Sequence, residues 1–135
     1  MEKIVRKEVV ELHAFFVDWF RGRLPQTTAA FARFAAVMAA GFYIVSPPGR
    51  LRERAPLLEG LWQAHGQWRA NGGTIEIRNV VLRGDDAKIW ATYEEWQAVN
   101  GEERGRLSSV LFSIDKTAPN DLVWHLVHET WLPES

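Results

Sequence analysis

The chain has 135 residues, with 16 basic and 17 acidic side chains and a formal net charge of −1. This length suits one domain, residues 1–135, and the balanced charge argues against a dedicated nucleic-acid binder. Cysteine is absent, which excludes disulfides, thiolate metal sites and cysteine nucleophiles. The N-terminus lacks a signal-peptide pattern, and the longest weakly charged stretch, residues 35–48, is too short to span a bilayer. We therefore expect a cytoplasmic protein with no nucleic-acid or membrane partner.

Apolar residues spaced three and four apart predict three helices in the first half of the chain. The expected helices cover about residues 2–21, residues 27 or 28 to 38 or 40, and about residues 50–70. Glu8 and Glu11 lie away from the apolar face of the first helix. Residues 42–45 predict a short strand or an extended link. Pro56 is expected in the first turn of the third helix or at a kink in it.

From residue 74 onward the apolar period changes to two, which predicts strands. The expected strands cover about residues 74–83, 87–99, 106–115 and 122–132. The phase of the first strand slips near Asn79-Val80, which indicates a bulge, and Asn100-Gly101 indicates a tight hairpin. Three helices followed by a four-stranded antiparallel meander form an α+β pattern, and one strongly curved sheet wrapped over the helices is the economical arrangement.

The last expected strand carries the most specific motif of the chain. It reads Trp124-His125-Leu126-Val127-His128-Glu129-Thr130-Trp131. This motif resembles the last strand of the NTF2-like superfamily, which commonly reads Trp-x-Ile-x-His-x-His-x-Ser. Trp124, Leu126 and His128 match that pattern, whereas Thr130 and Leu132 depart from it.

Two shorter segments carry the same resemblance. Asp86 to Tyr93 is similar to an acidic turn followed by an Ala-led strand, and Arg106 to Ser108 is similar to an Arg-x-Thr motif. Within the superfamily the closest likeness is to the SnoaL-like proteins and to the association domain of calmodulin-dependent protein kinase. The resemblance implies an NTF2-like (cystatin-like) cone, with three N-terminal helices against a strongly curved antiparallel sheet, a pocket at the wide end and dimerisation through the sheet. Members include ketosteroid isomerases, scytalone dehydratase, polyketide cyclases and non-catalytic assembly domains, so the fold leaves the function open.

The strand over residues 87–99 carries the main catalytic candidates. Side chains alternate along a strand, so Tyr93 and Glu95 share one face, and the resemblance puts that face inside the cone. The two groups would lie about 7 Å apart, and desolvation would raise the pKa of the Glu95 carboxyl toward the range useful for proton abstraction. The alternative is a core tyrosine beside a rim carboxylate that pairs with an arginine. Glu94 points to the opposite face, so no second carboxylate is expected in the pocket, which excludes a glycosidase.

The histidines offer a proton carrier rather than a metal site. His128 shares its strand face with Trp124 and Thr130, and the resemblance places it in the cone, as a supporting acid or as a hydrogen-bonded core residue. His125 and His128 lie three residues apart on a strand and point to opposite faces, which argues against metal binding. His65, on the apolar stripe of the third helix, has the same two interpretations as His128, with core packing favoured. Nucleotide-binding and other cofactor motifs are absent, so neither a metal nor a cofactor is expected.

The expected pocket wall combines helix and strand residues. Arg106 could pair with a carboxylate ligand, pair with Glu95 across the sheet, or lie at a solvated strand end, and Ser108 shares its face. The candidate ligand-binding residues are Phe16, Phe34, Met38, Trp62, Arg106, Ser108, Trp124 and Thr130.

Two tryptophans are expected outside the cone. Trp90 and Trp96 alternate with Tyr93 and Glu95, so they should cover the outer face of the sheet. A pair of exposed indoles would be costly in a monomer, which predicts a homodimer through the sheet.

The sequence leaves two functions open. The first is a small-molecule-binding domain whose apolar conical pocket takes an apolar or carboxylate-bearing ligand, with or without a cofactor-independent isomerase, dehydratase or cyclase activity. In that activity Glu95 would be the base, Tyr93 the oxyanion donor and His128 a supporting acid. The alternative is a non-catalytic association module whose pocket is filled by its own side chains. Glu95 argues against the alternative, because a carboxylate is hard to bury without a partner.

Overall fold

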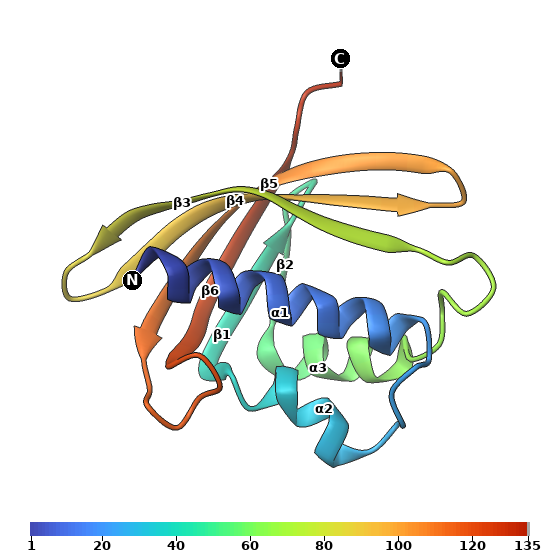
Figure 1. Cartoon of the computed structure of the whole chain (residues 1–135), viewed down its shortest axis with the longest axis horizontal. Coiled ribbons are helices and arrows are strands. Elements are labelled where there is room, and N and C mark those ends of the chain that lie inside the picture. Colours follow the sequence, from blue (N-terminus) through green and yellow to red (C-terminus); the bar gives the residue numbers. More distant parts are fainter. Residues whose placement is uncertain (135) are drawn as a thin grey trace.

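The computed structural model describes residues 1–134, in which three helices lie together on one side of a six-stranded curved sheet (Figure 1). The helices are α1 (Glu2–Phe20), α2 (Thr28–Ala35) and α3 (Arg54–Gln63). The strands are β1 (Met38–Ser46), β2 (Arg50–Glu53), β3 (Thr74–Asp85), β4 (Ile89–Val99), β5 (Glu102–Ile114) and β6 (Leu122–Trp131). The predicted α+β class, with helices packed against a strongly curved sheet, is confirmed. None of the helices in this described part of the chain is long and apolar enough to cross a bilayer.

The first helix forms as its apolar spacing predicts and buries one face against the sheet. Val5, Val9 and Leu12 are almost fully buried there, in a stripe that repeats at three and four residues. At the C-terminus of α1, the carbonyl of Trp19 accepts a hydrogen bond from Gly66 N–H at 3.1 Å. The last carbonyls of a helix have no partner within the helix and accept hydrogen bonds from outside it. The contact from Gly66 therefore ties the segment after α3 to the end of α1.

The second helix is shorter than predicted and is followed by a longer strand. It ends at Ala35 rather than at 38–40, and β1 begins at Met38. The backbone N–H of Trp124, in β6, donates to the carbonyl of Val37 at 2.8 Å, and β1 then runs parallel to β6. Pairing with a strand 80 or more residues away therefore overrides the helical tendency of this alanine-rich segment.

The third helix is also shorter than predicted. Residues 50–53 form β2, which pairs antiparallel with β1, and α3 covers Arg54–Gln63 only. Pro56 lies in the first turn, where a missing N–H costs no helical hydrogen bond. Gly66 then adopts a positive φ of 79°, a left-handed conformation that stops a helix.

The sheet has the order β2-β1-β6-β5-β4-β3, so the predicted four-stranded meander is extended by β1 and β2 at the β6 edge. Asn79, with a φ of 55°, lies where the β3–β4 register shifts, which confirms the predicted bulge. Asn100 and Gly101 both have positive φ and form the predicted hairpin turn between β4 and β5. A further bulge, which the sequence did not indicate, occurs at His125 in β6, where the β5–β6 register shifts.

Candidate functional site

A cavity of about 190 Å³ lies between the concave face of the sheet and the helices. Its wall is mostly aromatic and aliphatic, and it also includes His13, Arg52, Glu95, Arg106 and Glu129. Seven of the predicted site residues line it: Phe16, Phe34, Met38, Tyr93, Glu95, Arg106 and Trp124. A cavity of roughly 150 Å³ accepts a molecule the size of benzene, so this one has room for a ligand of about one ring.

Strand β4 presents its alternate side chains to the cavity, as predicted. Tyr93 and Glu95 are buried and line the cavity together with Gln97. Trp90 and Trp96 point to the other face of the sheet, where Trp90 is 45% exposed. The predicted inner and outer faces of β4 are therefore confirmed.

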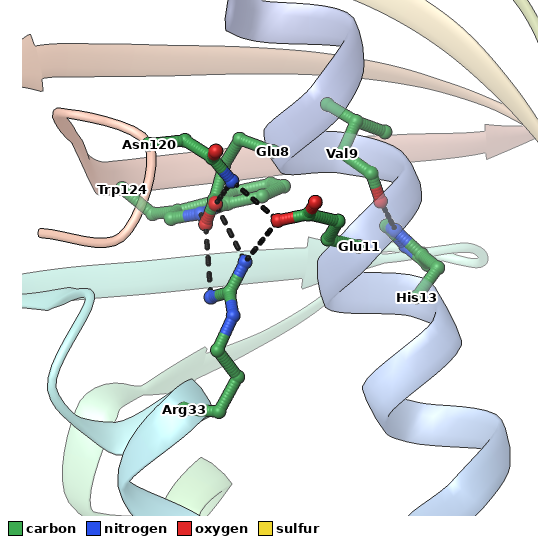
Figure 2. Close-up of polar contacts among 7 residues, drawn as sticks. All are labelled: Glu8, Val9, Glu11, His13, Arg33, Asn120 and Trp124. Carbon is green, nitrogen blue, oxygen red and sulfur yellow. Dashed lines mark hydrogen bonds and ion pairs between the residues drawn. The ribbon is translucent and has the colours of Figure 1, made fainter.

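Glu95 forms a buried pair with His13, which projects from α1. The imidazole Nε2 lies 3.1 Å from Glu95 Oε1, and both side chains are less than a tenth exposed. The other ring nitrogen, Nδ1, lies 2.7 Å from the carbonyl oxygen of Val9 (Figure 2). A carbonyl only accepts hydrogen bonds, so Nδ1 carries a hydrogen and Nε2 needs a second proton to donate to the carboxylate. Because the pKa of His13 is raised and that of Glu95 is lowered, the contact is an imidazolium–carboxylate pair below the pKa of His13.

The charges of this pair are mutually stabilised. Burial alone raises the pKa of Glu95, but the charge and hydrogen bond of His13, together with Arg106 and a 2.6 Å hydrogen bond from Gln97, outweigh it and lower the pKa to about 2. Burial alone lowers the pKa of His13, and Glu95 reverses this, so that the pKa lies above the ordinary value of 6.5. The expected raised pKa of Glu95 is thus wrong, because the expectation considered burial alone and not the pairing with His13, 82 residues away.

A second buried carboxylate, Glu129 on β6, faces the same cavity. It accepts a hydrogen bond of 3.2 Å from Arg106 Nη1, and its side chain is 5% exposed. Burial and the negative charge of Glu95 raise the pKa of Glu129, and Arg106 opposes this only in part. The expectation that no second carboxylate faces the pocket is therefore wrong.

The inward position of Glu129 follows from a bulge in β6. Leu126 pairs with Leu111, but Trp124 pairs with the next residue of β5, Phe112, so His125 is an extra residue in the ladder. A slip of one residue moves every following side chain to the opposite face. Val127 and Glu129 consequently point inward.

The same bulge overturns two of the predicted site residues. His128 and Thr130 were expected in the cone, but both are exposed on the outer face of β6 and lie outside the cavity lining. His128 therefore does not face the group that it was predicted to assist.

Two other predicted ligand-binding residues do not line the cavity. Trp62 lies among the helices, with its ring 5.6 Å from that of Trp19 and 5.4 Å from that of Phe31, because α3 turns this side chain toward α1 and α2. Ser108 lies opposite Tyr93 in the β4–β5 register and is fully buried outside the cavity lining. His65 packs edge-on against Trp19 and hydrogen-bonds the carbonyl of Leu24, the core role that the sequence favoured.

A network around Glu8 adjoins the cavity through Trp124. Glu8 is 0% exposed and accepts from both terminal nitrogens of Arg33, from Asn120 Nδ2 at 2.9 Å and from Trp124 Nε1 at 2.8 Å (Figure 2). The network joins α1, α2, β6 and the loop before β6. The expectation that Glu8 lies away from the buried face of α1 is wrong. Its side chain is buried, because hydrogen-bond donors from distant elements surround its carboxylate.

Sequence reasoning also missed His13 and Glu129 as site residues. His13 lies four residues after Val9 and three before Phe16, so its place on the apolar face of α1 was visible as a signal. No such signal marked Glu129, because regular alternation along β6 would place it on the outer face of the sheet, opposite to Trp124. In residues 1–134 no group of three or more His, Cys, Asp or Glu side chains has metal-binding geometry.

The sequence model of the sucrose-6-phosphate phosphohydrolase C-terminal family matches residues 5–133. The chain belongs to this family. Sucrose-phosphatase 2 of Nicotiana tabacum, for example, is 27% identical over 128 residues, which are 93% of this chain and 30% of that protein. The chain thus spans about 30% of the length of the curated relatives that it matches.

Solved structures place this member of the sucrose-6-phosphate phosphohydrolase C-terminal family in the NTF2-like superfamily. An NTF-2-like protein of unknown function from Pseudomonas aeruginosa has a TM-score of 0.83 at 25% identity, covering 96% of this chain and 99% of that one. The CaMKII hub of S. rosetta has a TM-score of 0.71 at 9% identity, covering 96% and 95%. The resemblance stated from the sequence motifs is therefore confirmed for the superfamily, whereas those motifs did not indicate the family within it.

Proposed function

We propose that the chain is a small-molecule-binding NTF2-like domain whose cavity takes a ligand with an apolar body and one carboxylate. The observation that carries this proposal is a pair of unused buried donors. The Nε atoms of Arg52 and Arg106, two residues that line the cavity, are buried without a hydrogen-bond partner among the described residues. A buried donor left unpaired is costly, and a planar guanidinium matches a carboxylate, so these two arginines favour an anionic oxygen ligand in the cavity.

The acidity of Glu95 favours binding over the catalytic interpretation. A carboxylate whose pKa is about 2 is a weak base at neutral pH, so proton abstraction by Glu95 has little support. The association module with a filled pocket is also less favoured, because a cavity of about 190 Å³ lies beside the charged groups.

A binding titration tests the ligand class. Calorimetric titration with phenylacetate and hexanoate is expected to give binding, and the matched amides, phenylacetamide and hexanamide, should bind about tenfold more weakly or less, since they lack the charge. Arg106→Gln should lose most of the carboxylate affinity, whereas Arg83→Gln, on the outer face of the sheet beside Thr92, is the control and should bind normally. Because the curated relatives are named sucrose-phosphatases, sucrose and sucrose 6-phosphate complete the panel. Amides that bind as well as acids, or binding of a sugar alone, would contradict the proposal.

We also propose that two copies pair through the outer face of the sheet. Val81, Trp90 and Leu107, on β3, β4 and β5, are each more than a third exposed there. Large exposed apolar groups gathered on one sheet face are typical of an interface.

Light scattering tests this dimer. The wild type is expected to have twice the chain mass at micromolar concentration, and Trp90→Lys/Leu107→Lys should have the mass of one chain, because two charges would have to be buried. Val10→Lys, at an equally exposed position on α1, is the control and should stay dimeric. A wild-type protein that is strictly monomeric would rule out the pairing.

A further inference from the structure

We infer that the ligand's carboxylate displaces Glu129 from Arg106, and that Glu129 takes up one proton from solvent as this happens. The inference rests on the proposed function and adds to it the coupling between ligand binding and protonation. No bond to the ligand forms in this exchange. The hydrogen bond from Arg106 moves from one carboxylate to another, and the displaced carboxylate becomes a neutral carboxylic acid.

Arg106 uses only part of its hydrogen-bonding capacity. Its guanidinium lies over the Trp131 ring at 4.9 Å and makes one hydrogen bond, from Nη1 to Glu129 at 3.2 Å. An arginine can bind a carboxylate through two parallel N–H groups, but Glu129 uses only one of them, and Nε has no partner among the described residues. Arg106 is therefore held in place but makes fewer hydrogen bonds than its guanidinium allows. An incoming carboxylate that accepts two of them would bind Arg106 better than Glu129 does.

The cavity around Arg106 and Glu129 holds side chains of both charges. The ionisable groups that line the cavity with Glu129 come from four elements: His13 on α1, Tyr93 and Glu95 on β4, Arg106 on β5, and Arg52 on β2. His13 is already committed to Glu95 at 3.1 Å, and Arg52 donates to Ser46 at 3.5 Å. An anionic ligand that takes the hydrogen bond of Arg106 would thus leave Glu129 without its guanidinium partner, in the same cavity as the carboxylate of Glu95.

Of the two buried carboxylates, Glu129 rather than Glu95 is the one expected to take up a proton. Glu95 keeps two partners, His13 and Gln97, and its carboxylate form is strongly favoured. Glu129 depends on Arg106 alone among the described side chains, and burial together with Glu95 already raises its pKa. A ligand carboxylate nearby raises the pKa of Glu129 further, by the same repulsion that Glu95 exerts. Protonation of Glu129 removes that repulsion, so it is the group expected to take up the proton.

Calorimetry in buffers of different ionisation enthalpy measures the proton directly. With phenylacetate between pH 6 and pH 8, we expect uptake of up to one proton per ligand and an affinity that rises as the pH falls. The complex holds the extra proton, so the affinity changes by up to about tenfold per pH unit within this range. Phenylacetamide, which carries no charge, should bind without proton uptake.

Two variants assign the proton to Glu129. Glu129→Gln is expected to bind phenylacetate with no proton uptake and with little dependence on pH, whereas Arg83→Gln, a change on the outer face of the sheet, should keep the uptake. Carbon-13 NMR of the Glu129 carboxyl in the wild type gives an independent reading, since its shift should report the protonated form only in the complex. This measurement stands if Glu129→Gln fails to fold.

The outcomes separate the two proposals. Carboxylate binding without proton uptake, or uptake that persists in Glu129→Gln, overturns the exchange and leaves the binding function standing. Absence of binding by every carboxylate at every pH overturns the binding function and the exchange together.

Discussion

Replacing Glu8 by leucine is expected to lower the free energy of unfolding by about 3 kcal/mol. The carboxylate is fully buried, and its removal leaves the Trp124 indole N–H without an acceptor and leaves Arg33 and Asn120 with Glu11 as their remaining carboxylate partner. Breaking a buried pair by removing one partner is costly because the other charge stays behind. Arg33 is only partly exposed, so water can restore its hydrogen bonds only in part. Urea unfolding followed by tryptophan fluorescence measures the loss.

Glu11→Leu is the matched control for this prediction. Glu11 lies one helical turn further along α1 and contacts the same Arg33 and Asn120, but its side chain is 44% exposed. Exposed ion pairs contribute little, so this variant should lose less than about 1 kcal/mol. Equal losses in the two variants would mean that the buried network around Glu8 does not stabilise the fold.

The second large effect is expected for His13→Leu, which should lower the free energy of unfolding by about 3 kcal/mol at pH 6. The substitution leaves the Glu95 carboxylate buried with Gln97 as its remaining hydrogen-bond donor. His128→Leu is the control, because His128 is exposed on the outer face and its loss should be within about 0.5 kcal/mol.

The pH dependence of His13→Leu distinguishes the ion pair from simple packing. In the wild type, the lowered pKa of Glu95 contributes stability above its ordinary value of 4.5, and this contribution is lost as the pH falls toward about 2. The raised pKa of His13 contributes stability below its ordinary value of 6.5, which is lost as the pH rises through the folded value. The pair therefore stabilises most between pH 4.5 and 6.5.

The difference between wild type and His13→Leu should narrow as the pH is lowered from 4.5 toward 2. In the variant, the buried Glu95 can become neutral by taking up a proton, so its burial costs less. Unfolding curves at several pH values measure this difference. A gap that stays constant with pH would indicate that His13 acts through its packing against Phe16 and Tyr93 rather than through its charge.

Local patterns predicted the fold and one wall of the site. The period-two alternation of β4 put Tyr93 and Glu95 on one face and Trp90 on the other, and the resemblance to the NTF2-like superfamily placed the first face inside; the structure confirms both. The helix boundaries were less predictable. Residues 38–40 and 50–53 were expected in helices but form strands, because pairing with distant or neighbouring strands outweighs a weak local preference.

The charged side of the site depended on contacts that no local pattern contains. His13 meets Glu95 across 82 residues, and Glu8 meets Trp124 across 116 residues. Each of these carboxylates is stable in the interior only because partners from other elements surround it.

By itself the sequence determined the α+β class and the two alternating faces of β4, since both follow from the spacing of residues within one element, and its resemblance to the NTF2-like superfamily implied the cone and which face of β4 lines it. Tertiary structure decided which polar groups enter the cavity. One extra residue, His125, in the β5–β6 ladder turned His128 outward and Glu129 inward. A bulge depends on how two strands pair, and it reverses every side chain after it, so a regular alternation along one strand could not reveal it.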